Sequence, residues 1–373
     1  MSGDAAASGS REEELVAQEK FIDSAMPLRA GEELATKALE GFLQERLAGA
    51  AGTLSIEQFP SGHSNLTYLL RMGEDEWVLR RPPFGAQARG GHDMSREFRV
   101  LSGLYNVYSL VPKPLLFSDD EDVLDAPFYV MERLRGVILR ATPPPELDLS
   151  PTVVRRLSEN FVDNLARIHT LDYEAAGLRD LGKPQGYVRR QITGWIDRYA
   201  VAKTDEIPEM ERVAAWLAER VPTERATGII HNDYKYDNLV LDPNDLTRIV
   251  GVLDWEMATL GDPVMDLASA LSYWIEARDS PALVAGSMGP THLPGSLTRR
   301  EIIALYSDKT GIDVSGFEYY YVYALFKLAV VLQQIYTRFA KGFTQDERFR
   351  SLGERVVVFA GIAERVIEDP AVF

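Results

Sequence analysis

Two short stretches decide the fold of this chain, IHNDYKYDNL at residues 230–239 and VLDWE at residues 252–256. Asp233 and Asn238 are five residues apart in the first stretch, so one tight loop can bring a carboxylate and an amide to the same centre. An apolar run ends at Asp254, sixteen residues after Asn238, as expected for a strand that delivers a second acid. Asp233 can take a hydroxyl proton while Asn238 and Asp254 face Mg²⁺. The spacing therefore predicts phosphoryl transfer.

Turn chemistry alone is the simplest alternative for this loop, because Asp and Asn are common turn residues. It does not account for the loop, the spacing and the strand ending in Asp together, and these form the pattern of the kinase template. A protein kinase would also show Asp-Phe-Gly and a later Ala-Pro-Glu, whereas this chain has DWE at 254–256 and GDPVMDLA at 261–268. The combination resembles the aminoglycoside phosphotransferase and choline kinase superfamily, which phosphorylates small molecules on a protein-kinase-like fold.

The order of predicted elements favours the same fold class, α+β with two lobes. We expect a small antiparallel sheet with one helix in an N-terminal lobe at residues 31–134, and a mostly helical lobe at 135–373. Residues 1–30 read as a flexible tail. Apolar spacing predicts the following elements: helices at 32–47 and 95–105, the latter capped by Ser95, and strands at 54–59, 66–71, 77–80, 114–118 and 128–133.

The first predicted hairpin carries a candidate phosphate-binding loop. Its residues are Ser61, Gly62, His63, Ser64 and Asn65, whose backbone N–H groups can cover phosphates. It has one glycine where protein kinases have three, so a plain hairpin turn would look the same.

The predicted strand at 128–133 is the candidate hinge between the lobes. We expect the backbone of Glu132 to Leu134 to bind adenine, and Met131 to line its pocket. An ordinary edge strand is the alternative. ATP is thus the expected phosphate donor, although the sequence does not distinguish ATP from GTP.

Arg80 stands where the kinase template has a lysine, with Glu97 as its partner in the following helix. Arginine keeps the charge but does not replace lysine without consequence, so a pseudokinase that only binds nucleotide is one interpretation. We favour a subgroup that uses arginine. VLRRPP at 78–83, REFRV at 96–100 and FYVME at 128–132 resemble the kinase-like domain associated with acyl-CoA dehydrogenases. This resemblance implies a hydroxyacyl-CoA as the acceptor.

Other polar residues of the predicted C-terminal lobe have competing interpretations. Lys235 can neutralise the transferring phosphate, or can be a solvated loop residue. His169 reads as a structural core residue, with a catalytic imidazole as the alternative, and His231 reads as a residue that organises the loop through hydrogen bonds. Asp266 is expected to anchor the catalytic loop, and Asp262 is left open between anchor and metal ligand.

A segment rich in cations and aromatic residues is the candidate acceptor surface. KPQGYVRRQ at 183–191 is followed by Trp195, Arg198 and Tyr199, which suit an anionic acceptor with a ring to stack. A solvated amphipathic helix explains the same residues equally well. An aminoglycoside or amino-alcohol kinase, which needs an acidic acceptor pocket, is the alternative function.

The composition limits the class of protein, its compartment and its partners. The 373 residues are 46% hydrophobic and 26% charged, which is ordinary for a globular protein. The absence of cysteine and the lack of a signal-peptide pattern favour the cytoplasm. A net charge of −16 argues against a nucleic-acid partner. The apolar segment at 319–332 is too short to span a membrane and reads as a buried helix. The oligomeric state stays open.

Overall fold

The computed structural model describes residues 20–60, 65–85, 92–344 and 346–373. The chain forms two compact units. The N-terminal unit contains residues up to 148 together with 172–178 and 236–258, and the C-terminal unit contains 149–171, 179–235 and 259–373. The predicted phosphate-binding residues Ser61, Gly62, His63 and Ser64 lie outside the described residues, as do residues 1–19 of the predicted tail.

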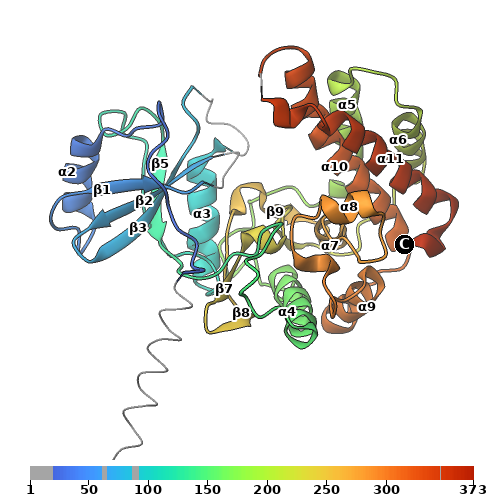
Figure 1. The fold of residues 1–373 in the computed structure, drawn as a ribbon, viewed down its shortest axis with the longest axis horizontal. Coiled ribbons are helices and arrows are strands. Elements are labelled where there is room, and N and C mark those ends of the chain that lie inside the picture. The colour runs from blue at the N-terminus through green and yellow to red at the C-terminus, as the bar shows by residue number, and fades with distance from the viewer. Residues whose placement is uncertain (1–19, 61–64, 86–91, 345) are drawn as a thin grey trace, which may run out of the picture. The chain divides into compact units, whose positions relative to one another are not determined.

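A five-stranded antiparallel sheet forms the framework of the N-terminal unit (Figure 1). Its strands follow the order β1-β2-β3-β5-β4, with bounds β1 Ser55–Gln58, β2 Leu66–Met72, β3 Asp75–Arg81, β4 Pro114–Ser118 and β5 Phe128–Glu132. Met72 pairs with Asp75, so the β2–β3 turn has only two residues. Gly73 opens this turn at φ 59°, a left-handed conformation that glycine adopts without steric cost.

Alternation along β3 gives the two faces of this sheet different partners. Trp77 and Leu79 belong to a buried cluster with Leu39 and Leu43 of helix α2 (Thr36–Arg46). Successive side chains of a strand point to opposite faces, so Arg80 points away from that cluster. Helix α3 (Met94–Tyr105) packs on β4 and β5.

Two predicted helix starts are wrong. Helix α2 begins at Thr36 rather than 32, because the Glu32 carboxylate accepts hydrogen bonds from Arg29 and Gln58, and these bonds tie it to the segment before the helix and to β1. Helix α3 is capped by Asp93, whose carboxylate accepts from the Arg96 N–H, and not by Ser95. Asp and Ser are comparable caps, so sequence alone did not separate them.

A second hairpin completes the N-terminal unit. Strands β7 (Leu239–Asp242) and β8 (Asp245–Val252) pair antiparallel and lie between the short 3₁₀ helices Tyr236–Asn238 and Trp255–Met257. The Val252 N–H donates to the Leu110 carbonyl over 2.7 Å. The hairpin thereby holds Asn238 and Asp254 in the same unit as Arg80.

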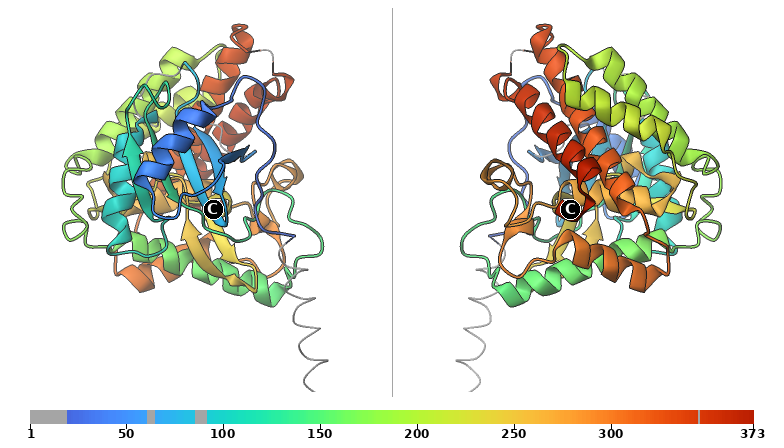
Figure 2. Two further views of the ribbon diagram at one scale, coloured as in Figure 1. Left: turned by 90° about the vertical axis from the view of Figure 1, so that its left-hand side faces the viewer. Right: turned by 90° about the vertical axis from the view of Figure 1, so that its right-hand side faces the viewer.

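Helices dominate the C-terminal unit, and the α+β fold class is confirmed. Its helices are α4 Pro151–His169, α5 Tyr187–Ala202, α6 Pro208–Glu219, α7 Pro263–Ser272, α8 Pro281–Ala285, α9 Arg299–Thr310, α10 Phe317–Ala340 and α11 Leu352–Glu368. Short 3₁₀ helices lie at Pro290–His292, Glu347–Phe349 and Pro370–Val372. Helix α10 packs against α5, α6, α7 and α11, and Figure 2 shows α10 and α11 running side by side. Among the described helices, none is long and apolar enough to cross a membrane.

Strands β6 (Gly228–Ile230) and β9 (Thr259–Gly261) form a two-stranded antiparallel pair in this unit. β6 leads directly into the loop that begins at His231, and β9 leads into α7. The pair therefore brings the catalytic-loop stretch and Asp266 of α7 together.

Candidate active site

Arg80 lies at the centre of an acidic cluster in the N-terminal unit. Its side chain extends from β3, and the residue is only 8% exposed. Nη1 lies 3.5 Å from Oε1 of Glu97. Nη2 lies 3.1 Å from Oδ1 of Asp254 and 3.2 Å from Oε2 of Glu256. One guanidinium can serve three carboxylates because its five N–H donors point in fixed, diverging directions.

Burial shifts the titration of this cluster. Burial raises the pKa of Glu97 to about 7, although Arg80 acts in the opposite direction. Burial alone would lower the pKa of Arg80, but the neighbouring acids, Glu97 above all, hold it well above its usual value. The guanidinium is therefore always charged. Three acidic side chains surround this one cation. A further positive charge, such as a metal ion, would therefore be electrostatically favourable in this cluster.

Glu256 extends the cluster to Asn65, the last residue of the predicted phosphate-binding loop. Its Oε2 accepts a hydrogen bond from Nδ2 of Asn65 over 2.6 Å. Oδ1 of Asn65 in turn accepts from Nδ1 of His92 over 2.9 Å, and Arg96 donates to the Glu256 carbonyl over 3.1 Å. Sequence reasoning gave Glu256 no role. Its place two residues after Asp254 was the available signal.

Asp254 and Asn238 supply the oxygen atoms expected of a magnesium site. The Leu253 N–H donates to the Asn238 carbonyl over 2.8 Å, so the residues before Asp254 run beside Asn238. Asp254 adopts φ 65°, which is uncommon for a non-glycine residue and typical of functional sites. No described cluster contains three or more His, Cys, Asp or Glu suited to a metal. Mg²⁺ commonly uses one or two protein oxygens and completes its shell with phosphates and water, so this donor set fits it.

The predicted hinge residues occupy the end of β5 and the segment beyond it. Met131 is 6% exposed and pairs with Val78 of β3. The Glu132 N–H already donates to the Lys113 carbonyl over 2.9 Å, so this donor is not available to adenine. A β-carbon at Gly251 would lie 2.2 Å from Cδ1 of Leu134. Leu134 therefore packs directly on the β8 backbone, and only glycine fits beneath it.

In the C-terminal unit, hydrogen bonds to Asp266 hold the loop that the sequence predicted to be catalytic. The N–H groups of His231 and Asn232 each donate to one oxygen of Asp266 over 2.7 Å. The Asp233 N–H donates to Nδ1 of His231 over 3.3 Å. Nζ of Lys235 lies 3.0 Å from Oδ2 of Asp233. Asp266 anchors the loop, as the sequence predicted. Lys235 forms an ion pair with the Asp233 carboxylate.

Both histidines singled out from the sequence are structural. His169 is 3% exposed and lies between Oδ2 of Asp266, 3.0 Å from its Nε2, and the Tyr306 hydroxyl, 2.7 Å from its Nδ1. Burial would raise the pKa of Asp266, but the hydrogen bond from His169 and the neighbouring His231 hold it below its usual value. Asp262 caps α7 and accepts from the Val264 and Arg225 N–H groups. Its oxygens therefore serve the fold.

The predicted acceptor segment divides into buried rings and outward cations. On α5, Trp195 is 9% exposed and Tyr199 is 2% exposed. The guanidinium of Arg198 lies over the Trp195 ring, 4.7 Å from its centre. Lys327 of α10 approaches the same ring at 5.9 Å and donates to the Asn232 carbonyl over 3.3 Å. Sequence reasoning missed Lys327, which lies within the apolar segment predicted as a buried helix.

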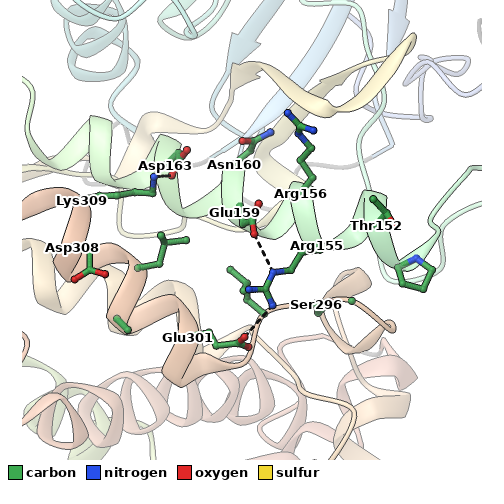
Figure 3. A pocket seen from close by; sticks show the side chains of 15 residues that line it. Thr152, Arg155, Arg156, Glu159, Asn160, Asp163, Ser296, Glu301, Asp308 and Lys309 are labelled. Carbon is green, nitrogen blue, oxygen red and sulfur yellow. Dashed lines mark hydrogen bonds and ion pairs between the residues drawn. The ribbon is translucent and has the colours of Figure 1, made fainter.

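A cavity of about 1000 Å³ opens elsewhere in the C-terminal unit, between α4 and α9 (Figure 3). Arg155 lies 3.0 Å from Glu159 and 3.0 Å from Glu301, and Lys309 lies 2.5 Å from Asp163. None of the residues predicted for phosphoryl transfer lines it. Arg155 and Lys309 are thus paired with carboxylates of the cavity wall.

Residues 55–294 match the model of the phosphotransferase enzyme family. The chain is 32% identical over 319 residues to acyl-CoA dehydrogenase family member 11 of Pongo abelii, which covers 84% of this chain and 40% of that protein. It is also 32% identical over 345 residues to family member 10 of Mus musculus, which covers 92% of this chain and 32% of that protein. The chain thus spans at most about two-fifths of the length of these relatives.

Solved structures show the same architecture. A candidate aminoglycoside phosphotransferase from Ralstonia eutropha is 32% identical and aligns with a TM-score of 0.76 over 89% of this chain and 97% of its own. Choline kinase from Cryptosporidium parvum shares the fold at 13% identity, with a TM-score of 0.61 over 91% of this chain and 98% of its own. These similarities agree with the resemblance that the sequence motifs indicated.

Proposed function

We propose, because this chain belongs to the phosphotransferase enzyme family, that it transfers the γ-phosphoryl group of ATP to a hydroxyl group of a hydroxyacyl-CoA. The family and fold support a small-molecule kinase. The observation that carries the catalytic assignment is the anchored loop, in which Asp266 fixes two successive backbone N–H groups directly before Asp233.

The N-terminal unit is proposed to bind the nucleotide. Arg80 would pair with the inner phosphates, and Glu97 would keep its guanidinium in place. Asn238 and Asp254 would hold Mg²⁺, which neutralises charge on the phosphates when it is bound. Met131, Leu134 and the backbone beyond Glu132 would receive the adenine. Asn65 and the preceding loop residues would cover the phosphates.

The C-terminal unit is proposed to activate the acceptor. Asp233 would accept the proton of the attacking hydroxyl and orient its oxygen toward the γ-phosphorus, where a P–O bond forms as the bond to the ADP oxygen breaks. Lys235, 3.0 Å from Asp233, would offset negative charge on the transferring group. Phosphoryl transfer depends mainly on such positioning and charge stabilisation.

The acyl-CoA acceptor rests on the relatives and on the charge of the acceptor side. The relatives carry acyl-CoA dehydrogenase names, and the chain matches a part of each. Arg198 and Lys327 flank Trp195, which suits an anionic acceptor better than an aminoglycoside.

Transfer of labelled γ-phosphate tests the proposal directly. Wild-type protein, ATP and Mg²⁺ would be incubated with 4-hydroxyhexanoyl-CoA, kanamycin or choline, with the Asp233→Asn variant in parallel. We expect transfer to the CoA ester, and a loss of about 10²- to 10⁴-fold in kcat for the variant with unchanged ATP binding. ATP binding without transfer to any acceptor would instead favour a nucleotide-binding pseudokinase. Preferred transfer to kanamycin or choline would favour an antibiotic or amino-alcohol kinase.

A further inference from the structure

Asn232 is held on three sides in the C-terminal unit. Its N–H donates to Asp266, its side-chain Oδ1 accepts from the Tyr187 hydroxyl over 3.4 Å, and its carbonyl accepts from Nζ of Lys327 over 3.3 Å. Its φ of 68° is uncommon for a non-glycine residue. These contacts fix the backbone directly before Asp233. They also place the ammonium of Lys327 beside the loop that carries the proposed base.

The ammonium of Lys327 has more hydrogen-bonding capacity than this contact uses. An ammonium carries three N–H donors, and among the described residues the hydrogen bond to the Asn232 carbonyl occupies one of them. The side chain lies on α10 among apolar neighbours and is only partly exposed. A desolvated cation of this kind is stabilised by an oxygen acceptor or an anion that arrives with a ligand.

Trp195 links Lys327 to a second cation. Lys327 lies 5.9 Å from the centre of the indole ring and the Arg198 guanidinium lies 4.7 Å from it. Helices α5 and α10 pack together, and the three side chains form one cluster around the largely buried Trp195 ring, here called the Trp195 platform. Burial lowers the pKa of Lys327, and the nearby Arg198 lowers it further, whereas Asp266 and Asp233 raise it. Both cations beside the ring carry N–H donors that suit an oxygen acceptor of a ligand.

We propose that the Trp195 platform, made of Trp195, Arg198 and Lys327, is the acceptor subsite and selects hydroxy compounds with an acyl oxygen over cationic amino alcohols. This inference rests on the proposed function, because it assumes that the acceptor hydroxyl meets Asp233. Lys327 donates to the acyl oxygen, and Arg198 and Trp195 hold the chain that follows. A thioester carbonyl and a free carboxylate share this chemistry.

If the role of Lys327 were purely structural, its substitution would have a different effect. If Lys327 only holds Asn232, its removal acts like the removal of another contact of Asn232, the hydrogen bond from the Tyr187 hydroxyl. Tyr187→Phe is therefore the matched control. It deletes the hydroxyl that donates to Asn232 and leaves the cations of the platform unchanged.

Steady-state kinetics with three acceptors separate these roles. Lys327→Met, Arg198→Met and Tyr187→Phe would be compared with wild type on 4-hydroxyhexanoyl-CoA, 4-hydroxyhexanoate and choline. We expect Lys327→Met to raise KM at least tenfold for the ester or the free acid, and not for choline. Whichever acyl compound shows the effect identifies the source of the oxygen. We expect Tyr187→Phe to lower kcat for every acceptor without this selectivity. Equal losses of kcat for Lys327→Met and Tyr187→Phe, with unchanged KM, would overturn the proposal.

A binding measurement keeps the subsite separate from the proposed reaction. The CoA ester and the free acid would be titrated calorimetrically into wild type and Lys327→Met, each saturated with a non-hydrolysable ATP analogue so that the nucleotide site is filled. Binding weakened at least tenfold in the variant supports the subsite, even if no phosphate is transferred and the proposed function fails. Equal affinity in both proteins, or no binding to wild type at millimolar ligand, rejects the subsite, even if transfer occurs.

Discussion

Nη2 of Arg80 lies 3.1 Å from Oδ1 of Asp254, so the strand residue proposed to hold the phosphates contacts the carboxylate proposed to hold the metal. A lysine at this position reaches fewer partners, because its ammonium is a single point on a flexible stem. The same guanidinium also contacts Glu97 and Glu256. Arg80 therefore makes several contacts that a lysine at this position would not make together, so the two residues are not interchangeable here.

Arg80→Lys should lower kcat/KM for ATP because at least one buried carboxylate loses its partner. The cost of an unsatisfied buried acceptor is about 1–3 kcal/mol, which predicts a loss of roughly 5- to 150-fold. Arg81→Lys is the matched control, since Arg81 is the next residue of β3 and pairs with Asp125 over 2.7 Å. Initial rates at varied ATP measure the effect. Similar kinetics for wild type and Arg80→Lys would contradict the assigned role.

Asn238→Ala should raise the Mg²⁺ concentration needed for half-maximal activity by about 10-fold or more, the scale seen when metal-site groups are removed. The backbone bond from Leu253 to the Asn238 carbonyl is kept, so the β7–β8 hairpin should persist. A magnesium titration at saturating ATP measures the shift, and a chelator should abolish turnover. Asn244→Ala, in the turn of the same hairpin, is the control. An unchanged Mg²⁺ requirement in Asn238→Ala would remove Asn238 from the metal site.

Asp266→Asn should destabilise the protein at pH 7 by about 1–3 kcal/mol, because the single amide oxygen of asparagine cannot accept from His169, His231 and Asn232 together and a buried donor loses its partner. His169 holds the folded-state pKa of Asp266 below its ordinary value of 3.8. The unfolded chain therefore binds this proton more readily, so the contribution is fully present above pH 3.8 and is lost as the pH falls through the folded-state pKa. Urea unfolding at several pH values measures it. A difference between wild type and variant that does not shrink at low pH would contradict the linkage.

The sequence predicted the fold, and the loop proposed to be catalytic, from signals that are local. Asp233 and Asn238 are fixed by spacing within one loop, and Asp254 by the end of an apolar run. Only one contact of Arg80 was predicted. Its pairing with Glu97 follows from the kinase pattern, whereas its contact with Glu256 does not. The Glu132 N–H, expected to meet adenine, donates to Lys113 instead. This pairing depends on sheet register that the sequence does not show.

Lys327 illustrates what the sequence could not provide. It lies 95 residues from Asn232 in the sequence. The apolar pattern of its helix does not indicate a function for a lysine at this position. Its significance comes from helix packing, which brings α10 against α5. Side chains that act through tertiary contacts carry no periodic signal, so the acceptor side was predicted only as a group of cations and rings on α5.

Glu256→Gln should weaken ATP use without changing the KM of the acceptor. Arg80 and Asn65 both donate to the same carboxylate oxygen, Oε2, and the neutral amide oxygen of glutamine is a weaker acceptor than a charged carboxylate oxygen. We expect kcat/KM for ATP to fall about 10-fold, which is roughly 1.4 kcal/mol. If the loss comes through Asn65, then Asn65→Ala and Glu256→Gln should couple by about 1 kcal/mol in a double-mutant cycle. Additive losses together with a raised Mg²⁺ requirement would instead make Glu256 a metal ligand.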